Sequence, residues 1–528
     1  FLGIQMLDAI IIGGGHNGLV CANYLAIAGK KVRVLERRNV VGGAAVTEEF
    51  HPGFRNSVAA YTVSLLNPKV INDLQLHQNG LKIVHRKVNN LWPHDNGDFL
   101  AFVVGSDNLK AEIARFSKTD ADALDRYFRD TSMVADIIRD FLLETPPNVG
   151  GGIRDIFKAA KFGNRLRKLP IEDERIVLDI FTKSVSDFLD LYFENEYVKG
   201  AFAFDGIVGN YADTQTPGSA YVLMHHAFGE VNGEKGVWGH AIGGMGAITQ
   251  AMAKSAMDKG VEIETDAAVK KVLVKDGKAY AVLLENGETL EAKVIVSNLN
   301  PSLLYNQLVD PKHLPDDFAR RMKHYKNGSG TFRMNVALSE LPKFTCLTQQ
   351  ERASAEHLTG GIIIGATCDY IDQAYRDSKQ HGWSKAPIVE MLIPSTLDDT
   401  LAPEGQHVAS LFCQQFDPDI DWDLHRETAA DLIIEQIEKV APGFKQSVLG
   451  RQVLSPLDLE RIFGLTKGDI MHGNMSLDQM FSTRPLLGHG NYRSPIKGLY
   501  MCGAGTHPGG GVTGAPGHNA AREIIKDN

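Results

Sequence analysis

The stretch that decides the fold is residues 7–36, LDAIIIGGGHNGLVCANYLAIAGKKVRVLE. It opens with a short apolar run, Leu7 to Ile12, of the kind found in buried parallel strands. Three glycines follow in the spacing GxGxxG, at Gly13, Gly15 and Gly18. Apolar residues then recur at helical intervals as far as Gly29, and a second apolar run ends at Glu36. The sequence therefore predicts a strand, a glycine loop, a helix and a second strand that ends in an acid.

This unit has every part of a dinucleotide-binding site. The first glycine permits the turn, the second lets the backbone approach a pyrophosphate, and the third lets the helix pack on the strand. The acid at the end of the second strand can accept hydrogen bonds from ribose hydroxyls. The cofactor-binding residues predicted from this unit are Gly13, Gly15, His16, Asn17, Gly18, Glu36 and Arg37.

The next stretch, RRNVVGGAAVTEEF, bears on the choice between NAD and FAD. Its Gly42-Gly43 doublet resembles the second phosphate-side signature of the large flavoproteins related to glutathione reductase, which implies FAD and adds Gly42, Gly43 and Ala44 to the predicted site. Arg37 and Arg38 leave two interpretations open. They form either a 2′-phosphate site, as in NADP enzymes, or a solvated or pyrophosphate-facing pair.

Composition excludes several classes of protein. At 528 residues the chain needs two or more packed units, and its net charge of -9 gives no basic excess for a nucleic-acid partner. The five cysteines contain no CxxC pair, so neither a zinc ribbon nor a redox dithiol is indicated. His225 and His226 lack further ligands at metal spacing, so we predict no metal site. Oligomeric state is left open.

The rest of the chain alternates between helical and strand patterns. Residues 105–230 are predicted to be mainly helical, and a helix is expected from about Ala247 to Lys259. The pairs Asp276-Gly277 and Asn286-Gly287 predict two hairpins, whose first strand would bring Val269 near the adenine. Residues 331–415 are rich in strands, which we expect to form a sheet over the flavin ring, and a helix follows around 426–440.

A second glycine-rich stretch, LYMCGAGTHPGGGVTGAPGHNAA, covers residues 499–521. It predicts a strand, a glycine-rich loop with one histidine and two prolines, and a terminal helix. Glycine suits close approach of the backbone to a ligand, and a helix N-terminus offers free N–H groups. The stretch is therefore expected to form part of a binding site.

These stretches, together with TPGSAYVLMHHAFGEVNGEKGVWGHAIGGMGA and LERIFGLTKGDIMHGNMSLDQMF, resemble the phytoene desaturase-like flavoproteins over essentially the whole chain. The resemblance implies an α/β fold of the two-dinucleotide-binding-domain flavoprotein type: a Rossmann-like FAD-binding domain of the glutathione reductase superfamily with an interleaved α+β substrate domain that contains an antiparallel sheet and helices. It assigns residues 6–104, 231–300 and 495–528 to the FAD-binding domain. The substrate domain then consists of residues 105–230 and 301–494.

The same resemblance places the C-terminal loop beside the isoalloxazine, where the following helix start would stabilise reduced flavin. It adds five predicted flavin-binding residues, Gly503, Gly505, Val512, Thr513 and Gly514. Three side chains are candidates for the substrate side of the ring, His507, His240 and Tyr61, each with a packing or loop-fixing role as the alternative.

The expected activity is that of an FAD-dependent oxidoreductase that removes hydride from a hydrophobic small molecule. Three alternatives stay open: a flavin-type carotenoid desaturase or ketolase, an amine oxidase-like enzyme with an aromatic cage, and an FAD-containing interaction protein without turnover. A second glycine motif is absent downstream of the first one, so no separate NAD(P)H domain is predicted.

One basic segment, residues 153–170, stands out in an acidic chain. It mixes apolar and cationic residues at helical spacing, interrupted by Gly163-Asn164, and is either a solvated helix face or a contact with anionic lipid near the mouth of a substrate tunnel. Because no apolar run is long enough to span a bilayer, the expected location is cytoplasmic or membrane-peripheral. An animal chain that has lost a leader would lie in the mitochondrial matrix.

Overall fold

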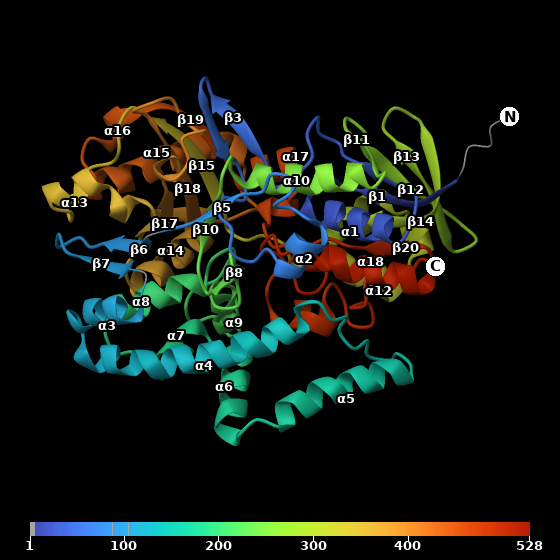
Figure 1. The fold of residues 1–528 in the computed structure, drawn as a ribbon, viewed down its shortest axis with the longest axis horizontal. Helices are drawn as coiled ribbons and strands as arrows, with labels where there is room; N and C mark the ends of the chain where they lie inside the picture. The colour runs from blue at the N-terminus through green and yellow to red at the C-terminus, as the bar shows by residue number, and fades with distance from the viewer. Residues whose placement is uncertain (1–5, 87, 104) are drawn as a thin grey trace.

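A computed structural model describes residues 6–86, 88–103 and 105–528, so the predicted boundary at 104 falls outside the described residues. Figure 1 shows two sheets side by side, with a group of helices below them. We call them the nucleotide sheet, the second sheet and the helical group.

The nucleotide sheet is built from segments far apart in the chain. Its strand order is β11-β2-β1-β14-β13-β12, and β20 pairs with β14. The pairs β1–β2, β1–β14, β2–β11 and β14–β20 are parallel. The strands are β1 (Leu7–Ile12), β2 (Val32–Leu35), β11 (Glu262–Glu264), β12 (Val269–Lys275), β13 (Lys278–Leu284), β14 (Thr289–Ser297) and β20 (Leu499–Met501). The predicted first strand and both hairpins are confirmed.

Three helices pack around this sheet, α1 (His16–Ile27), α10 (Met245–Asp258) and α18 (Ala515–Asp527) (Figure 1). Their small apolar residues, such as Cys21 and Ala520, are fully buried against the strands. Short residues allow the helices to approach the sheet closely, which explains the Ala- and Gly-rich sequence of both α1 and α18. The predicted helix from about Ala247 is confirmed as α10.

The second sheet has the order β19-β15-β18-β17-β16-β6-β7. Its strands are β6 (Val88–Pro93), β7 (Phe99–Val103), β15 (Phe332–Leu338), β16 (Gly361–Ile364), β17 (Trp383–Leu392), β18 (His407–Phe416) and β19 (Val448–Leu454). The predicted strands within 331–415 and the helix that follows, α15 (Trp422–Val440), are confirmed. However, β6 and β7 belong here through pairing of β6 with β16, which corrects the predicted grouping of residues 6–104 with the FAD-binding domain.

The helical group consists of the predicted helices within 105–230. They are α3 (Ser106–Ala114), α4 (Lys118–Leu142), α5 (Ile153–Arg167), α6 (Ile171–Thr182), α7 (Val185–Leu189), α8 (Glu196–Asp205) and α9 (Ser219–Leu223). The expected break at Gly163-Asn164 is wrong, because α5 runs through both residues. An exposed glycine weakens a helix by only about 1 kcal/mol and need not end it.

Smaller elements connect these units. They are β3 (Thr47–His51), β4 (Phe54–Ser57), α2 (Pro68–Asp73), β5 (Ile83–His85), β8 (Glu230–Val231), β9 (Glu234–Lys235), β10 (Gly239–Ala241), α11 (Pro301–Leu303), α12 (Asp316–Lys323), α13 (Gln349–Ser354), α14 (Cys368–His381), α16 (Phe444–Ser447) and α17 (Pro456–Phe463). In the part of the chain described here, no helix combines the length and the apolar character needed to cross a membrane.

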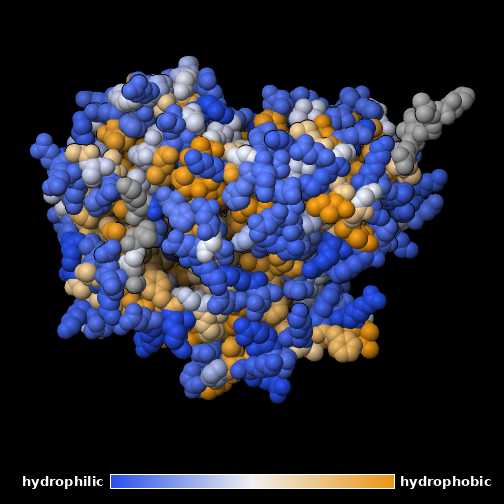
Figure 2. Space-filling model, in the orientation of Figure 1, coloured by the Kyte–Doolittle hydropathy of each residue, from blue (hydrophilic) through white to orange (hydrophobic). Residues whose placement is uncertain are grey.

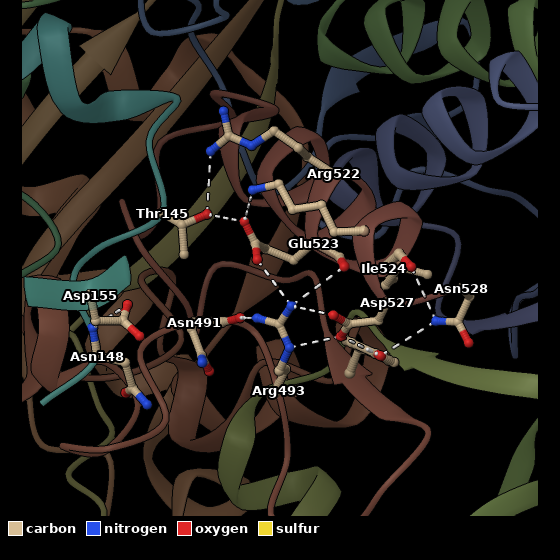
Figure 3. A network of polar contacts seen from close by, with 12 residues as sticks. Thr145, Asn148, Asp155, Asn491, Arg493, Arg522, Glu523, Ile524, Asp527 and Asn528 are labelled. Carbon is tan, nitrogen blue, oxygen red and sulfur yellow. Dashed lines mark hydrogen bonds and ion pairs between the residues drawn. The ribbon is translucent and has the colours of Figure 1, made fainter. Parts of the chain in front are cut away.

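A polar network fixes the last helix to the loop between α4 and α5 (Figure 3). The Thr145 hydroxyl donates to Glu523 at 2.7 Å, and Arg493 donates to Glu523 at 3.0 Å and to Asp527 at 2.8 Å. Burial opposes ionisation of Glu523, but hydrogen bonds from Lys526 and Thr145 outweigh it and lower the pKa to about 2. The carboxylate therefore links the helical group to the nucleotide sheet.

Candidate functional site

A cavity of about 410 Å³ lies at the carboxyl ends of β1, β2 and β14. Residues that directly follow these strands line it, namely Gly13, Glu36 and Asn298. In an open parallel sheet this edge is where ligands bind. The predicted cofactor residues that line the cavity are Gly13, Gly15, His16, Asn17, Glu36, Arg37, Gly43, Ala44 and Val269.

The glycines of the first loop leave no room for side chains. A Cβ on Gly18 would lie 2.3 Å from the Gly13 carbonyl oxygen, and one on Gly15 would lie 2.9 Å from Asn298 Nδ2. Gly18 is therefore needed for close packing of α1, as its place in the motif predicts. Gly42 forms a backbone bridge with Gly15, which positions the second glycine doublet directly against the first loop.

Glu36 is positioned by the loop that it supports. Its Oε2 accepts a hydrogen bond from Gly14 N and its Oε1 accepts one from Arg38 N, both at 2.9 Å. The side chain is buried, yet it lines the cavity. Since each carboxylate oxygen has two lone pairs, Glu36 keeps acceptor capacity for a ribose hydroxyl.

Several buried polar atoms of the cavity wall have no hydrogen-bond partner within the described chain. They are His16 Nε2, Asn17 Oδ1, Arg38 Nη1 and, from a segment near the C-terminus, His472 Nδ1. Burial lowers the pKa of His16 to about 4 and that of His472 to about 3, so both rings are neutral at pH 7. Buried polar atoms normally have partners, so these atoms fit a polar ligand.

The start of α1 adds to this fit. It has no side-chain cap and no acidic residue in its first turn. A helix N-terminus of this kind favours a negative group because its N–H donors and dipole both face it. The cavity therefore accommodates the pyrophosphate and ribose of a dinucleotide.

A second cavity of about 150 Å³ continues from the first. The two share five lining residues, His16, Ala44, Leu465, His472 and Ala504. The wall of the second cavity is mainly apolar and includes residues of α9, β18 and the C-terminal loop. An elongated cofactor could thus lie along the first cavity and present its far end to the second.

Of the five predicted flavin-binding residues in the C-terminal loop, one lines this cavity. Val512 lines it, as expected, together with Ala504, Gly510 and Gly511. By contrast, Gly505 packs against Pro301, where a Cβ would lie 2.4 Å from the proline Cδ. Gly503 similarly faces the Asn298 backbone, while Thr513 and Gly514 lie at the start of α18. The flavin-binding role of these four residues stays a prediction.

Arg484, which lies before the C-terminal loop in the sequence, fixes the position of that loop. This buried side chain donates to the backbone oxygens of Ala504 at 3.0 Å and Gln479 at 2.9 Å, and also to Met471. Asp469, also buried, accepts from the backbone N–H groups of Met471 and Gly473. These two charged residues fix the 469–474 segment and Ala504 in the cavity wall.

Of the three candidate substrate-side residues, Tyr61 lines the apolar cavity. Its hydroxyl donates to Glu390 Oε2 at 2.5 Å. Its ring stacks on Phe412 with centroids 5.3 Å apart and lies 4.8 Å from the Arg333 guanidinium. Burial raises the pKa of both Tyr61 and Glu390.

The two histidine candidates have structural partners instead. His507 Nε2 is bound to the Phe141 carbonyl at 2.9 Å, and His240 Nε2 is bound to Asp398 at 2.8 Å. Neither is among the described lining residues of the two cavities. These positions favour the loop-fixing alternative that the sequence left open.

Three further residues of the cavity wall were missed as site residues: His225, His226 and Arg333. His226 Nε2 lies 3.4 Å from Asp205, and burial lowers the His226 pKa to about 3. Burial also lowers the Arg333 pKa, to about 10, which leaves the guanidinium charged at pH 7. The adjacent histidines were visible in the sequence, whereas Arg333 lies on an apolar strand and gives no signal there.

Comparison with known proteins agrees with this geometry. A family model described as "Flavin containing amine oxidoreductase" matches residues 18–525. Pyridine nucleotide-disulfide oxidoreductase domain-containing protein 2 of Rattus norvegicus is 39% identical over 98% of this chain and 93% of its own. Chloroplastic prolycopene isomerase of Arabidopsis thaliana is 25% identical over 97% and 81%, respectively.

Among solved structures, cyclohexylamine oxidase from Brevibacterium oxydans IH-35A superposes with a TM-score of 0.59, at 15% identity, over 99% of both chains. The flavoprotein fold and the resemblance to the phytoene desaturase-like family are thereby confirmed.

Proposed function

The chain belongs to the flavin-containing amine oxidoreductase family and is an FAD-dependent oxidoreductase, and we propose that its substrate is a compact apolar molecule from which it removes a hydride. The observation that carries this proposal is the apolar cavity that continues from the dinucleotide cavity. The Arabidopsis relative, whose name refers to prolycopene, supports an apolar substrate class.

The residues that would hold FAD are those of the larger cavity. The first glycine loop and the start of α1 suit the pyrophosphate, Glu36 suits a ribose, and the unpartnered His16 and His472 stand where the two cavities join. When bound, FAD supplies the two-electron acceptor for the hydride.

The size of the apolar cavity limits the substrate. An apolar cavity of about 150 Å³ holds a ligand the size of benzene in other proteins. A forty-carbon carotenoid is several times larger and would extend well beyond this cavity. The volume therefore favours a compact substrate, or a compact apolar group of a larger one, over the carotenoid desaturase and ketolase alternatives.

Tyr61 and Glu390 offer a path for the proton that accompanies hydride removal. Loss of a hydride from one carbon and a proton from its neighbour leaves a double bond, with no change in the remaining atoms. The Tyr61 hydroxyl oxygen accepts that proton while its own proton moves to Glu390 Oε2, along the existing 2.5 Å hydrogen bond. Burial makes the Glu390 carboxylate a stronger base than it is in water.

The amine oxidase alternative fits the cavity less well. The described C-terminal loop residues in the wall are Ala504, Gly510, Gly511 and Val512, none of which is aromatic. The charged group in the wall is Arg333, which repels an ammonium group. The aromatic residues of the wall, Tyr61, Trp238 and Phe412, come from other segments, and the positive charge of Arg333 favours a neutral substrate.

The test is anaerobic titration of the FAD-loaded protein, followed by the visible spectrum of the flavin. A compact terpene should shift or bleach the spectrum, whereas phytoene in detergent micelles and primary amines should leave it unchanged. The variant Ala60→Phe, which fills the cavity, should retain FAD and lose the terpene response. Bleaching by amines would overturn the proposal, and a flavin silent toward every compound would favour the interaction-protein alternative.

A further inference from the structure

Helix α5 lies apart from the body of the protein (Figure 1). None of its residues is buried. Its attachment is narrow: the Phe162 ring packs against Phe141 and Phe481, with centroid distances of 4.8 and 5.4 Å, and Leu166 packs against the core of the helical group. One long face of α5 is therefore free of contacts with the rest of the described chain.

Both ends of α5 are nevertheless fixed. At its start, Asp155 accepts a hydrogen bond from Asn148 N at 3.1 Å, and Thr145 ties the same loop to Glu523 (Figure 3). At its end the chain enters α6, whose Val177 and Ile180 are buried in the core. The exposed face is thus carried on an anchored helix.

The free face is apolar at the beginning of the helix. Ile153, Ile156 and Phe157 are 69%, 65% and 68% exposed, and Val149 in the preceding loop is 59% exposed. The three helical residues have the spacing i, i+3, i+4, which places them on one side. Figure 2 shows apolar atoms gathered at this end of α5, at the lower right of the molecule. We call these four residues the apolar tip.

Cations lie beside the apolar tip and further along α5. Residues 153–168 contain six basic side chains and one acidic one, a net charge of +5 in a chain whose total is -9. Lys158 pairs with Asp155, Lys161 lies 3.7 Å from Glu144, and Arg165 lies 3.2 Å from Asp140. Within the described residues, Arg154, Arg167 and Lys168 form no ion pair and remain available to an external anion.

We propose that α5 is a docking surface for an anionic lipid surface, with the apolar tip inserted among the headgroups and the flanking cations on lipid phosphates. A ridge of apolar side chains with a row of cations beside it is the pattern of interfacial helices. A lipid surface needs no matching groove, which suits a helix that projects from the body, and its negative charge complements the segment.

The test uses the full-length, FAD-loaded protein in flotation with vesicles of phosphatidylcholine alone or with 30% phosphatidylserine. The protein should float with the anionic vesicles at 50 mM salt, detach at 500 mM, and ignore the neutral ones. In the variant F157W, tryptophan emission should shift to the blue on addition of the anionic vesicles.

Two variants and one control separate the contributions. Ile153→Ser/Ile156→Ser/Phe157→Ser and Arg154→Gln/Arg167→Gln/Lys168→Gln should each lower vesicle affinity at least tenfold. Arg320→Gln/Arg321→Gln/Lys323→Gln, which removes the same charge from the exposed helix α12, should bind like the parent. Flavin content and thermal stability, measured for all of them, establish that each variant is folded.

The proposal is overturned if the parent fails to float, or if both α5 variants float as well as it does. Light scattering of the parent and the serine variant, without lipid, shows whether the apolar tip instead joins two copies of the chain. A dimer that depends on Phe157 in the absence of lipid, without flotation, would assign the apolar tip to a second copy of the chain.

Discussion

The chain has two glycine-rich loops that face the same pair of cavities, residues 13–18 and residues 502–514, and they are positioned by different means. In the first loop the glycines themselves make the site, because α1, β1 and Asn298 lie too close for side chains. In the second loop Gly503 and Gly505 face the protein, and Arg484 holds the lining residue Ala504. Glycines therefore shape the cavity wall in the first loop, whereas Gly503 and Gly505 of the second loop pack against Asn298 and Pro301.

The largest effect is expected where the second loop depends on a distant residue. Arg484→Leu leaves several buried carbonyl groups without donors and should lower the free energy of unfolding by about 4 kcal/mol, as well as weaken flavin retention. Urea unfolding of the parent, this variant and the exposed control Arg320→Leu measures it. A stable variant with bound FAD would mean that the second loop is held by its own glycines after all.

The first loop should respond to a single methyl group. Gly18→Ala brings a Cβ within 2.3 Å of the Gly13 oxygen and should cost about 3 kcal/mol of stability, together with loss of bound FAD. The matched control is Gly163→Ala in α5, where no atom lies within 4 Å of the new Cβ. That variant should gain up to about 1 kcal/mol. Equal melting temperatures for the two variants would contradict the tight packing of the first loop.

Loss of Glu36 should affect binding more than folding. Glu36→Ala removes a charged acceptor and frees Gly14 N and Arg38 N, which should weaken FAD binding by about 2 kcal/mol. Equilibrium dialysis of FAD against the apoprotein gives the dissociation constants. If Glu36→Ala binds FAD as the parent does, the carboxylate supports the loop alone.

The smallest effect concerns the helix that follows the second loop. The pKa of Glu523 is lowered to about 2 in the folded protein, from an ordinary value of 4.5, so its ionised form favours folding. Its contribution is present in full above pH 4.5 and is lost as the pH falls toward 2. In urea unfolding between pH 7 and pH 3, the free energy of unfolding should therefore fall less for Glu523→Gln than for the parent.

A control for this measurement is Glu404→Gln, which changes an exposed loop residue. Its free energy of unfolding should fall with decreasing pH as steeply as that of the parent. Parallel curves for Glu523→Gln and the parent would show that Glu523 does not link the two parts of the structure.

The sequence by itself determined the nucleotide unit and the cofactor. The motif from Leu7 to Glu36 encodes its own geometry, because a strand, a tight turn and a helix interact through neighbours in the chain. The two hairpins at Asp276-Gly277 and Asn286-Gly287 followed from turn chemistry that is equally local.

Only the tertiary structure decided which residues form the apolar cavity. Tyr61, Arg333 and His472 meet there from segments hundreds of residues apart, and no local pattern encodes such a contact. The same holds for β6, which pairs with its sequence neighbour β7 on one side and with the distant strand β16 on the other. His507 and His240 illustrate the same point, because their hydrogen-bond partners, Phe141 and Asp398, are also remote in the chain. A local motif specifies backbone shape, whereas the direction in which a buried side chain points depends on long-range packing.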